Sequence, residues 1–451
     1  MKIKFLYETK IGDEFIPNGM GDVLLSEYID SLKSNNLEKN MIEFQTKYNM
    51  TFPYVNNHDL IRDDRYETIS NSNSIINDYY GDSSQLYLYY IGTGGNLAGG
   101  LGEYHPNNFS SYIENIPDST KKLIRTCKNV FLYICQHQEE ISLTTFYKLY
   151  TECLLNEIPL DKVFVSSDNF NFEDIYNTLL REYNINLDIK FFNYPWALYQ
   201  ASNLVRYLEN QNNIVTDIQY NRNKKLLCFN RYLREHKILA ISYLLCNDYE
   251  SDCYLSFDTN FLPDEVYESC NSILVKRGYD RMMDEKKLVI DYDDLNEGSF
   301  IYDDKNLYDS SYFSLVTETI FNGGRITEKT FKPIINKHPF ILFAPPKSLE
   351  YLKYYNFKTF GEYIDESYDN DIEPTERYQK LFKLIDFIVN KSRDELDVLT
   401  MQLSDILIHN KNLLEEYNHS NMLIDFEKNI TKIVNNTFTN KFKSIINPKS
   451  I

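Results

Sequence analysis

The stretch that decides the fold runs from Val130-Phe-Leu-Tyr-Ile-Cys135 to Val163-Phe-Val165. Its first run is uniformly apolar and predicts a buried strand. After a polar loop, Ser142 can cap a helix whose apolar residues recur at helical spacing: Leu143, Phe146, Tyr147, Tyr150 and Leu154. Strand, helix and strand in this order predict a βαβ unit with parallel strands, so the loop after the first strand lies at the carboxyl edge of the sheet. Ligands of open α/β sheets bind at that edge.

The same alternation continues on both sides of this unit. Apolar runs predict further strands at 2–7, 86–91, 189–193, 226–229, 254–257, 288–290, 313–316 and 340–343. Helices are predicted at 23–32, 234–245, 349–355, about 375–390 and 393–417, whereas the polar stretch 35–84 is predicted to contain loops. We therefore predict an α/β fold of two Rossmann-like domains facing a cleft, with C-terminal helices packing back.

A polar stretch at 210–223 serves as the predicted linker between the domains. The N-terminal domain is placed at 1–215, the C-terminal domain at 216–385 and a helical extension at 386–451. The acidic segment 362–376 holds seven carboxylates and no basic residue, and it is predicted to be a solvated surface loop.

Composition excludes several classes of protein. The chain of 451 residues has 47 basic and 66 acidic residues and a net charge of −19, opposite in sign to a general nucleic-acid or anionic-membrane binder. Any phosphate ligand must then meet a local basic cluster. No apolar run reaches the length of a membrane span and no signal peptide is present, so we expect a cytoplasmic protein. Seven cysteines without a C-x-x-C pair, expected to be mostly buried apolar residues, and seven scattered histidines give no support for a zinc site.

The chemistry is concentrated in the segment from Ser311 to Phe331. A strand ends there in Glu318, two glycines allow a flexible loop, and Thr327 can cap a short helix that begins with Glu328 and Lys329. Uncapped amides at such a helix start form an anion site, to which Lys329 and Arg325 add full charges. A carboxylate beside that site cannot favour phosphate, and ribose hydroxyls are its natural partners. Pro333 is expected to interrupt the helix one turn in.

These residues resemble a known family. Ile326-Thr-Glu-Lys329 looks like the [VI]-T-E-K block of α1,3-fucosyltransferases, and Glu318 falls where that family has the Glu of its F-E-N block. The wider segment 311–370 is similar to a group of viral and bacterial glycosyltransferases in three further places: Pro339-Phe-Ile341, Phe357-Lys-Thr-Phe360 and Asp365-Glu-Ser-Tyr-Asp369. A fainter similarity covers Asn230 to His236. The chain departs from the fucosyltransferase block at Thr319-Ile320, so the resemblance does not extend to fucose itself.

The resemblance implies a GT-B glycosyltransferase, a hexosyl- or pentosyltransferase that inverts the sugar and requires no metal or cofactor. The nucleotide-sugar donor would bind the C-terminal domain, with Glu328 on the ribose and Lys329 with Arg231 or Arg234 on the diphosphate. Glu318 would lie near the sugar or position the loop. A glycan or other hydroxyl acceptor would bind the N-terminal domain; nucleic acid is disfavoured by the charge.

The catalytic base is sought at the N-terminal sheet edge. Inverting transfer needs a carboxylate that takes the proton of the acceptor hydroxyl. The loop after the strand at 130–135 contains Glu139 and Glu140, and adjacent carboxylates repel, which raises the pKa of one of them. A solvated loop that caps the following helix is the alternative. Glu103, His105 and Asp22 are reserve candidates.

Two other functions remain open from the sequence. The same architecture is compatible with a non-catalytic binding protein for a sugar or nucleotide. Alternatively, Asp291-Tyr-Asp293-Asp294 after Val289-Ile290 has the form of the metal-binding D-x-D of GT-A enzymes, which predicts a metal-dependent transferase.

Overall fold

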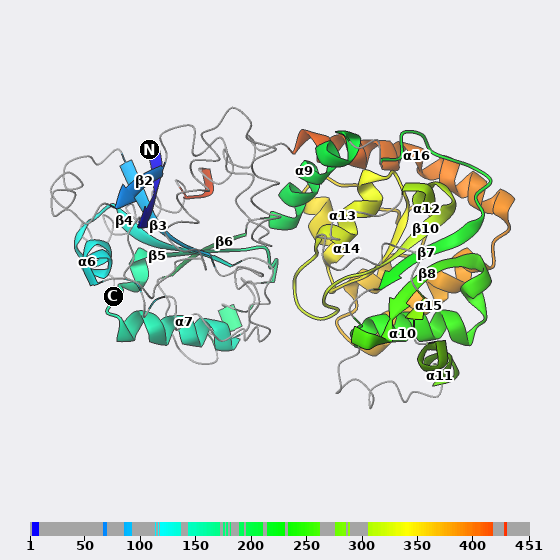
Figure 1. The fold of residues 1–451 in the computed structure, drawn as a ribbon, viewed down its shortest axis with the longest axis horizontal. Coiled ribbons are helices and arrows are strands. Elements are labelled where there is room, and N and C mark those ends of the chain that lie inside the picture. The colour runs from blue at the N-terminus through cyan, green and yellow to red at the C-terminus, as the bar shows by residue number, and fades with distance from the viewer. Residues whose placement is uncertain are drawn as a thin grey trace. The chain divides into compact units, whose positions relative to one another are not determined.

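A computed structural model of the chain describes most of its C-terminal half and parts of the rest (Figure 1). The described residues are 2–8, 66–69, 85–92, 113, 116, 118–136, 143–171, 175, 177, 178, 181, 189–193, 195–210, 214–230, 233–261, 276–285, 287–288, 305–417 and 428–430. The chain divides into two compact units, Met1–Trp196 with His419–Ile451 and Ala197–Asn418. The predicted boundaries at 215 and 385 both fall within the second unit.

The first unit contains a six-stranded parallel sheet. Its spatial order is β2-β1-β3-β4-β5-β6, and the strands are β1 (Lys2–Glu8), β2 (Tyr66–Ile69), β3 (Gln85–Gly92), β4 (Val130–Gln136), β5 (Val163–Ser167) and β6 (Lys190–Asn193). Helix α7 (Leu143–Leu155) connects β4 to β5, which confirms the predicted βαβ unit. Helices α6 (Asp118–Thr126) and η3 (Leu160–Lys162) complete the described part. Aliphatic side chains from β4, β5, α6 and α7 form one buried core.

The second unit contains a five-stranded sheet in the order β11-β10-β7-β8-β9. Its strands are β7 (Lys224–Asn230), β8 (Cys253–Asp258), β9 (Lys287–Leu288), β10 (Ser311–Thr317) and β11 (Phe340–Phe343). All pairs are parallel except the short edge strand β9, which runs antiparallel to β8. Strand β10 is buried along its whole length, as a strand covered on both faces should be.

Helices precede and follow the strands of this sheet. They are α9 (Trp196–Asn210), α10 (Glu235–Cys246), η4 (Tyr249–Asp252), η5 (Thr259–Phe261), α11 (Lys276–Glu285), α12 (Lys305–Asp309), α13 (Glu328–Ile335), α14 (Ser348–Tyr354), η7 (Ser367–Asn370), α15 (Pro374–Val389) and α16 (Arg393–Glu416). Helix α15 packs against β7 and β11, and α16 packs against α13. The predicted α/β class with two Rossmann-like sheets is confirmed.

One strand was not predicted and one expectation was wrong. The four-residue strand β2 lies within the polar stretch 35–84, where it pairs with β1 from Phe5 opposite Tyr66 to Glu8 opposite Ile69. The acidic segment 362–376 is not a solvated loop, because Asp369 is buried and its carboxylate accepts the amides of Leu349 and Glu350 at the start of α14.

The structure describes the burial of most of the cysteines. Cys127, Cys153, Cys228 and Cys253 are buried free thiols, as predicted for most of the cysteines.

No helix in the described part of the chain is long and apolar enough to cross a membrane.

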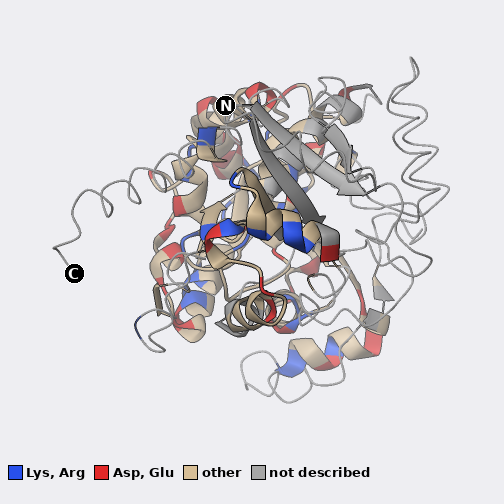
Figure 2. Ribbon diagram, turned by 90° about the vertical axis from the view of Figure 1, so that its left-hand side faces the viewer, with Lys and Arg blue, Asp and Glu red and all other residues tan. Residues whose placement is uncertain are grey.

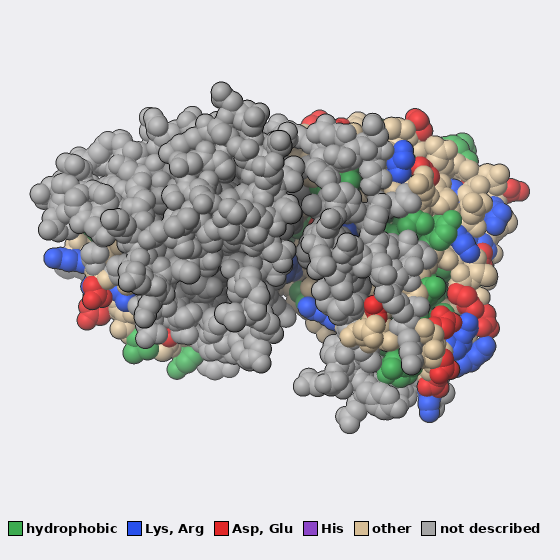
Figure 3. Space-filling view, viewed as in Figure 1, with side chains coloured by type: hydrophobic (Ala, Val, Ile, Leu, Met, Phe, Trp, Pro, Cys, Tyr) green, Lys and Arg blue, Asp and Glu red, His purple; other side chains and the backbone are tan. Residues whose placement is uncertain are grey.

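The charges of the described residues are mixed in sign over the surface. Figure 2 shows basic and acidic residues interspersed along the described helices, and Figure 3 shows side chains of both signs next to one another over the second unit. Some form ion pairs, such as Arg281 with Asp248 at 2.8 Å and with Glu250 at 2.6 Å. Such surface pairs contribute about 0–1 kcal/mol each. In these views the described residues form no extended basic face of the kind that a long polyanion needs.

Replacing Gly278 with alanine should destabilise the second unit. The new Cβ would lie 1.8 Å from the carbonyl oxygen of Ser242 and 2.9 Å from the amide nitrogen of Cys246, both backbone atoms of α10. Helices α10 and α11 must then separate, and we expect the free energy of unfolding to fall by about 3 kcal/mol or more in urea titrations. Asp280→Ala, at an exposed position of α11, should change it by less than about 0.5 kcal/mol. Equal stability of the two variants would contradict this close packing.

Candidate functional site

Two strands of the second sheet end side by side at its carboxyl edge. Asn230 ends β7 and Thr317 ends β10, and the buried Thr317 hydroxyl donates a hydrogen bond of 2.6 Å to the Asn230 side-chain oxygen. The chain leads from β7 into α10 and from β10 into α13. Two helix N-termini, each with a partial positive charge, therefore lie at the same edge of the sheet.

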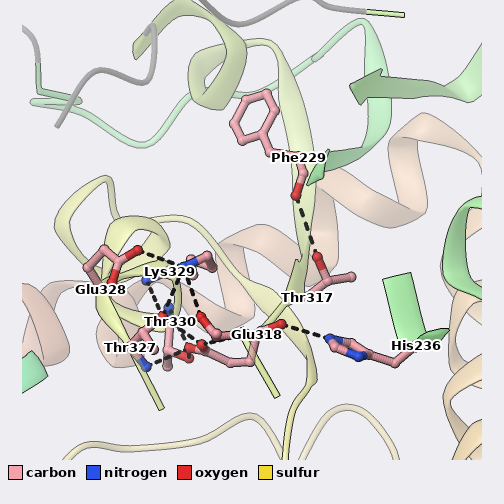
Figure 4. A network of polar contacts seen from close by, with 9 residues as sticks. Phe229, His236, Thr317, Glu318, Thr327, Glu328, Lys329 and Thr330 are labelled. Atoms are coloured by element: carbon pink, nitrogen blue, oxygen red, sulfur yellow. Dashed lines mark hydrogen bonds and ion pairs between the residues drawn. The ribbon is translucent and has the colours of Figure 1, made fainter. Parts of the chain in front are cut away.

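The carboxylate of Glu318 is buried directly after β10 and is bonded by five donors (Figure 4). Three donors are backbone amides, those of Thr319 (3.1 Å), Thr327 (2.9 Å) and Thr330 (3.2 Å). The other two are the hydroxyls of Thr327 (2.6 Å) and Thr330 (2.5 Å). This single side chain ties the loop after β10 to the first turn of α13.

His236 of α10 holds the same loop from the opposite side. Its Nε2 lies 2.7 Å from the carbonyl oxygen of Glu318, so Nε2 carries the proton and donates it (Figure 4). Burial lowers the pKa of His236 to about 3, and the ring is therefore neutral at physiological pH. A neutral donor fixes the loop without adding a charge next to the buried carboxylate.

Arg377 of α15 holds the middle of the loop. Its guanidinium donates to the carbonyl oxygen of Phe321 (2.5 Å) and to the side-chain oxygen of Asn322 (2.9 Å), and it lies 3.8 Å from the centroid of the Phe321 ring. Gly323 follows with φ at 117°, a backbone angle that L side chains rarely adopt. The loop from β10 to α13 is thus fixed by three elements that are far apart in the sequence.

The first turn of α13 is capped from inside the protein. Thr327 is its N-cap, as predicted, and its hydroxyl accepts the amide of Lys329 at 3.4 Å. The amides of Thr327 and Thr330 are bonded to Glu318, which occupies the place that we expected a ligand anion to take. The expectation of uncapped amides at this helix was therefore wrong. Helix α10, by contrast, starts after Arg234 without any side-chain cap.

Pro333 does not end α13, which continues to Ile335. That expectation was also wrong. Phe331, Ile334 and Ile335 are buried in the core, and burial of such side chains stabilises by about 1.5–3 kcal/mol each, which outweighs one missing helical hydrogen bond.

Glu328 and Lys329 form an ion pair at the start of α13. The Lys329 ammonium lies 2.7 Å from a Glu328 carboxylate oxygen and also donates to the hydroxyls of Thr319 (3.2 Å) and Thr327 (3.3 Å) (Figure 4). Burial would raise the pKa of Glu328, but the charge and hydrogen bond of Lys329 outweigh it and the pKa falls to about 2. Glu328 is therefore an ionised acceptor over the whole physiological range.

Lys237 is the one buried cation at this edge whose ammonium has no hydrogen-bond partner among the described residues. The residue is 4% exposed and lies in the first turn of α10. Burial, reinforced by the charges of Lys329 and Arg234, lowers the pKa of Lys237 to about 7, against a smaller opposite effect of Glu318 and Glu328. An ammonium in a largely buried side chain gains from a bound anion, so this group is a candidate anion ligand.

The sequence analysis missed Lys237. Its spacing of three residues from Arg234, at the start of a helix that follows a strand, places both cations on one side of the first turn. That spacing was the available signal; the burial of the side chain was not visible in the sequence.

The other predicted site residues are partly described. Arg325 is buried in the loop before α13, and Arg234 is exposed at the start of α10. The structure brings Arg234 and Lys329 near Lys237. The positive charges of Arg234 and Lys329 together lower the pKa of Lys237. Several candidates lie outside the described residues: Arg231, Glu139, Glu140, Glu103, His105, Asp22 and the run from Asp291 to Asp294. Within the described part, no three His, Cys, Asp or Glu side chains are grouped to hold a metal ion.

No protein-family model and no curated protein matches the chain. Among solved structures it is similar to the apo structure of OtsA, with 11% identity, 75% of this chain and 72% of that chain covered, and a TM-score of 0.40. It is also similar to an α,α-trehalose-phosphate synthase (UDP-forming) from Burkholderia xenovorans in complex with glucose-6-phosphate (10% identity, 90% and 82% covered, TM-score 0.40). A glycosyltransferase from Rickettsia africae ESF-5 is a third (13% identity, 96% and 99% covered, TM-score 0.40). At these identities and TM-scores the similarities carry no conclusion about activity.

Glu318→Ala should destabilise the second unit strongly. The substitution leaves three amides and two hydroxyls without their common acceptor, and each unsatisfied buried donor costs about 1–3 kcal/mol. We expect the free energy of unfolding to fall by about 3 kcal/mol or more, measured by urea unfolding. Glu362→Ala removes an exposed carboxylate from the same unit and should have almost no effect. A stable Glu318→Ala protein would mean that the loop is held mainly by Arg377 and His236.

Proposed function

We propose that this protein is a glycosyltransferase that takes a sugar from a nucleotide-diphosphate donor and transfers it to a hydroxyl acceptor. The observation that carries the proposal is Lys237, a buried residue whose ammonium is bonded by no described residue. Together with Arg234 and Lys329 it forms a compact group of cations, within an acidic protein, at the edge where α/β sheets bind ligands. A diphosphate matches this group in size and charge.

The diphosphate would be met from α10 rather than from α13. The amides at the start of α13 are bonded to Glu318 and Thr327, whereas α10 has no side-chain cap. The α10 dipole and Lys237 would therefore face one phosphate, with Arg234 and Lys329 on the other. The same cations would stabilise the charge that develops on the nucleoside diphosphate as it leaves.

Glu328 would bind the ribose of the donor. Its carboxylate is ionised, lies next to Lys329 and can accept hydrogen bonds only, so it repels phosphate and attracts hydroxyl groups. Glu318 has no such role in this proposal, because its five donors already use the carboxylate. The proposed base for an inverting transfer remains Glu139 or Glu140.

Titration of the full chain with UDP, GDP and inorganic pyrophosphate by calorimetry tests the donor site. We expect Lys237→Met and Lys329→Met to lower the affinity for a nucleoside diphosphate and for pyrophosphate alike, by about 10-fold to 100-fold. This is the effect of losing one hydrogen bond to a charged group. Glu328→Gln should lower the affinity for the nucleoside diphosphate by about 10-fold and leave the affinity for pyrophosphate unchanged, because pyrophosphate has no ribose. Lys383→Met, an exposed position on α15, is the matched control.

The outcomes separate the possible functions. Failure of every diphosphate to bind, or equal binding by Lys237→Met and Lys383→Met, would overturn the donor site. Binding without any transfer to added acceptors would instead favour a non-catalytic binding protein, and loss of transfer in EDTA would favour a metal-dependent transferase. The anomeric configuration of the product, read by NMR, tests inversion.

Binding of a nucleoside diphosphate should take up a proton near pH 8. The free Lys237 has a pKa of about 7, below its ordinary 10.5, and a bound anion stabilises the ammonium and moves the pKa back upward. Affinity should therefore fall as the pH rises from 7 to 9, by up to about tenfold per unit. Calorimetry in two buffers of different ionisation enthalpy measures the uptake. Lys237→Met should abolish it; an unchanged uptake in that variant would assign the proton to another group.

A further inference from the structure

The carboxyl end of β5 in the first unit is polar and deeply buried. Ser167, the last residue of the strand, and Asp168 and Asn169 after it are each no more than 3% exposed. Loops are normally solvated, because their polar groups need partners. Three consecutive buried polar residues at a sheet edge therefore need an explanation.

Two side-chain amide atoms at this edge have no hydrogen-bond partner in the structure. Asn169 accepts the amide of Asn171 at 2.9 Å and donates its own backbone amide to Ser167 Oγ at 3.0 Å, but its side-chain Nδ2 is buried and unbonded. Asn193 ends β6, and its side-chain Oδ1 is likewise buried and unbonded. Both atoms belong to the described part of the chain.

These two atoms belong to neighbouring strand ends. Strands β5 and β6 pair in parallel, with Ser167 opposite Asn193 (Figure 1). Side chains of directly opposite residues lie on the same face of a sheet, so Asn193 lies on the face of Ser167, the residue to which Asn169 is bonded. The edge thus presents an unused donor and an unused acceptor at the ends of two neighbouring strands.

A hydroxyl-rich ligand would satisfy both atoms. A hydroxyl group donates one hydrogen bond and accepts others, so neighbouring hydroxyls of a sugar can accept from Asn169 Nδ2 and donate to Asn193 Oδ1. The segment Ser167–Asn171 carries the carboxylate of Asp168 and no cation, which disfavours a phosphorylated ligand. Native proteins keep few unsatisfied buried groups, and a binding site is one reason to keep them.

We infer that the carboxyl ends of β5 and β6 form a binding site for a neutral sugar or glycan, through Asn169 and Asn193. That this sugar is the acceptor of the transfer rests on the proposed function. Both amide atoms are covered in the structure, so binding requires the covering side chains to move, and we expect affinities in the millimolar range for a single sugar ring.

Leucine variants at Asn169 and Asn193, made in the full chain, test the site. Leucine has the branched shape and the heavy-atom count of asparagine. Asn193→Leu removes no hydrogen bond among the described residues and should melt at the wild-type temperature or above it, whereas Asn169→Leu also removes the acceptor of the Asn171 amide and should melt slightly lower. The probes are the methyl α-glycosides of glucose, galactose, mannose and fucose, followed by saturation-transfer NMR. We expect at least one probe to bind the wild-type protein. Each variant should lower the affinity for that probe by tenfold or more. Asn156→Leu is the control, because Asn156 is bonded to Lys121 and Glu152 and should lose stability while keeping sugar binding.

The results distinguish this site from the donor site. Wild-type protein that binds none of the probes, or variants that bind them as wild type does, would overturn the inference even if nucleoside diphosphates bind the second unit. Variants that lose the sugar but keep diphosphate affinity would support it. Loss of sugar binding in a protein that binds no diphosphate at all would support the sugar site and overturn its role as acceptor site.

Discussion

The buried carboxylate of Glu318 is the interaction on which the carboxyl edge of the second sheet depends. An unexposed carboxylate is tolerable only when its oxygens are fully bonded, and here three amides and two hydroxyls bond it. The loop after β10 must follow the positions of those donors, with Gly323 supplying the one backbone angle that other residues resist. The same arrangement occupies the amides of α13. Attraction of an anion to this edge therefore depends on α10 and on side-chain cations.

Lys237 is the electrostatic opposite of Glu318 at the same edge. Glu318 has every oxygen bonded, whereas the Lys237 ammonium has no partner among the described residues and lies close to the like charges of Arg234 and Lys329. The lysine reduces this repulsion by giving up its proton more easily, with its pKa lowered to about 7. A bound anion would reverse that effect. Protonation of Lys237 would thus add positive charge to this edge when an anion binds, as the proposed donor site requires.

Much of the fold could be predicted because it depends on local patterns. Strands such as β4 and β10 are apolar runs, and α15 and α16 follow helical spacing, with Pro374 at the start of α15 and the capping box of Ser392 and Glu395 at the start of α16. The strand and the acidic segment that were missed depend on partners that are distant in the sequence. Strand β2 is ordered by pairing with β1, and the carboxylate of Asp369 is satisfied by amides about twenty residues earlier. The sequence shows that Glu318 and Lys237 carry charge, but not that one is fully bonded and the other is not.

Both sheets end in polar groups that the protein itself leaves unsatisfied, and the difference between them limits what each edge can bind. At the carboxyl edge of the second unit, the Lys237 ammonium has two further cations nearby, which favours an anionic ligand. In the first unit the unbonded atoms at this edge include those of the neutral amides of Asn169 and Asn193, next to the Asp168 carboxylate, which disfavours an anion there. Each group lowers stability, and a protein loses little by replacing such a group unless a ligand uses it. A transferase that joins a charged donor to a neutral acceptor needs this division of chemistry, because two cationic edges would compete for the same diphosphate.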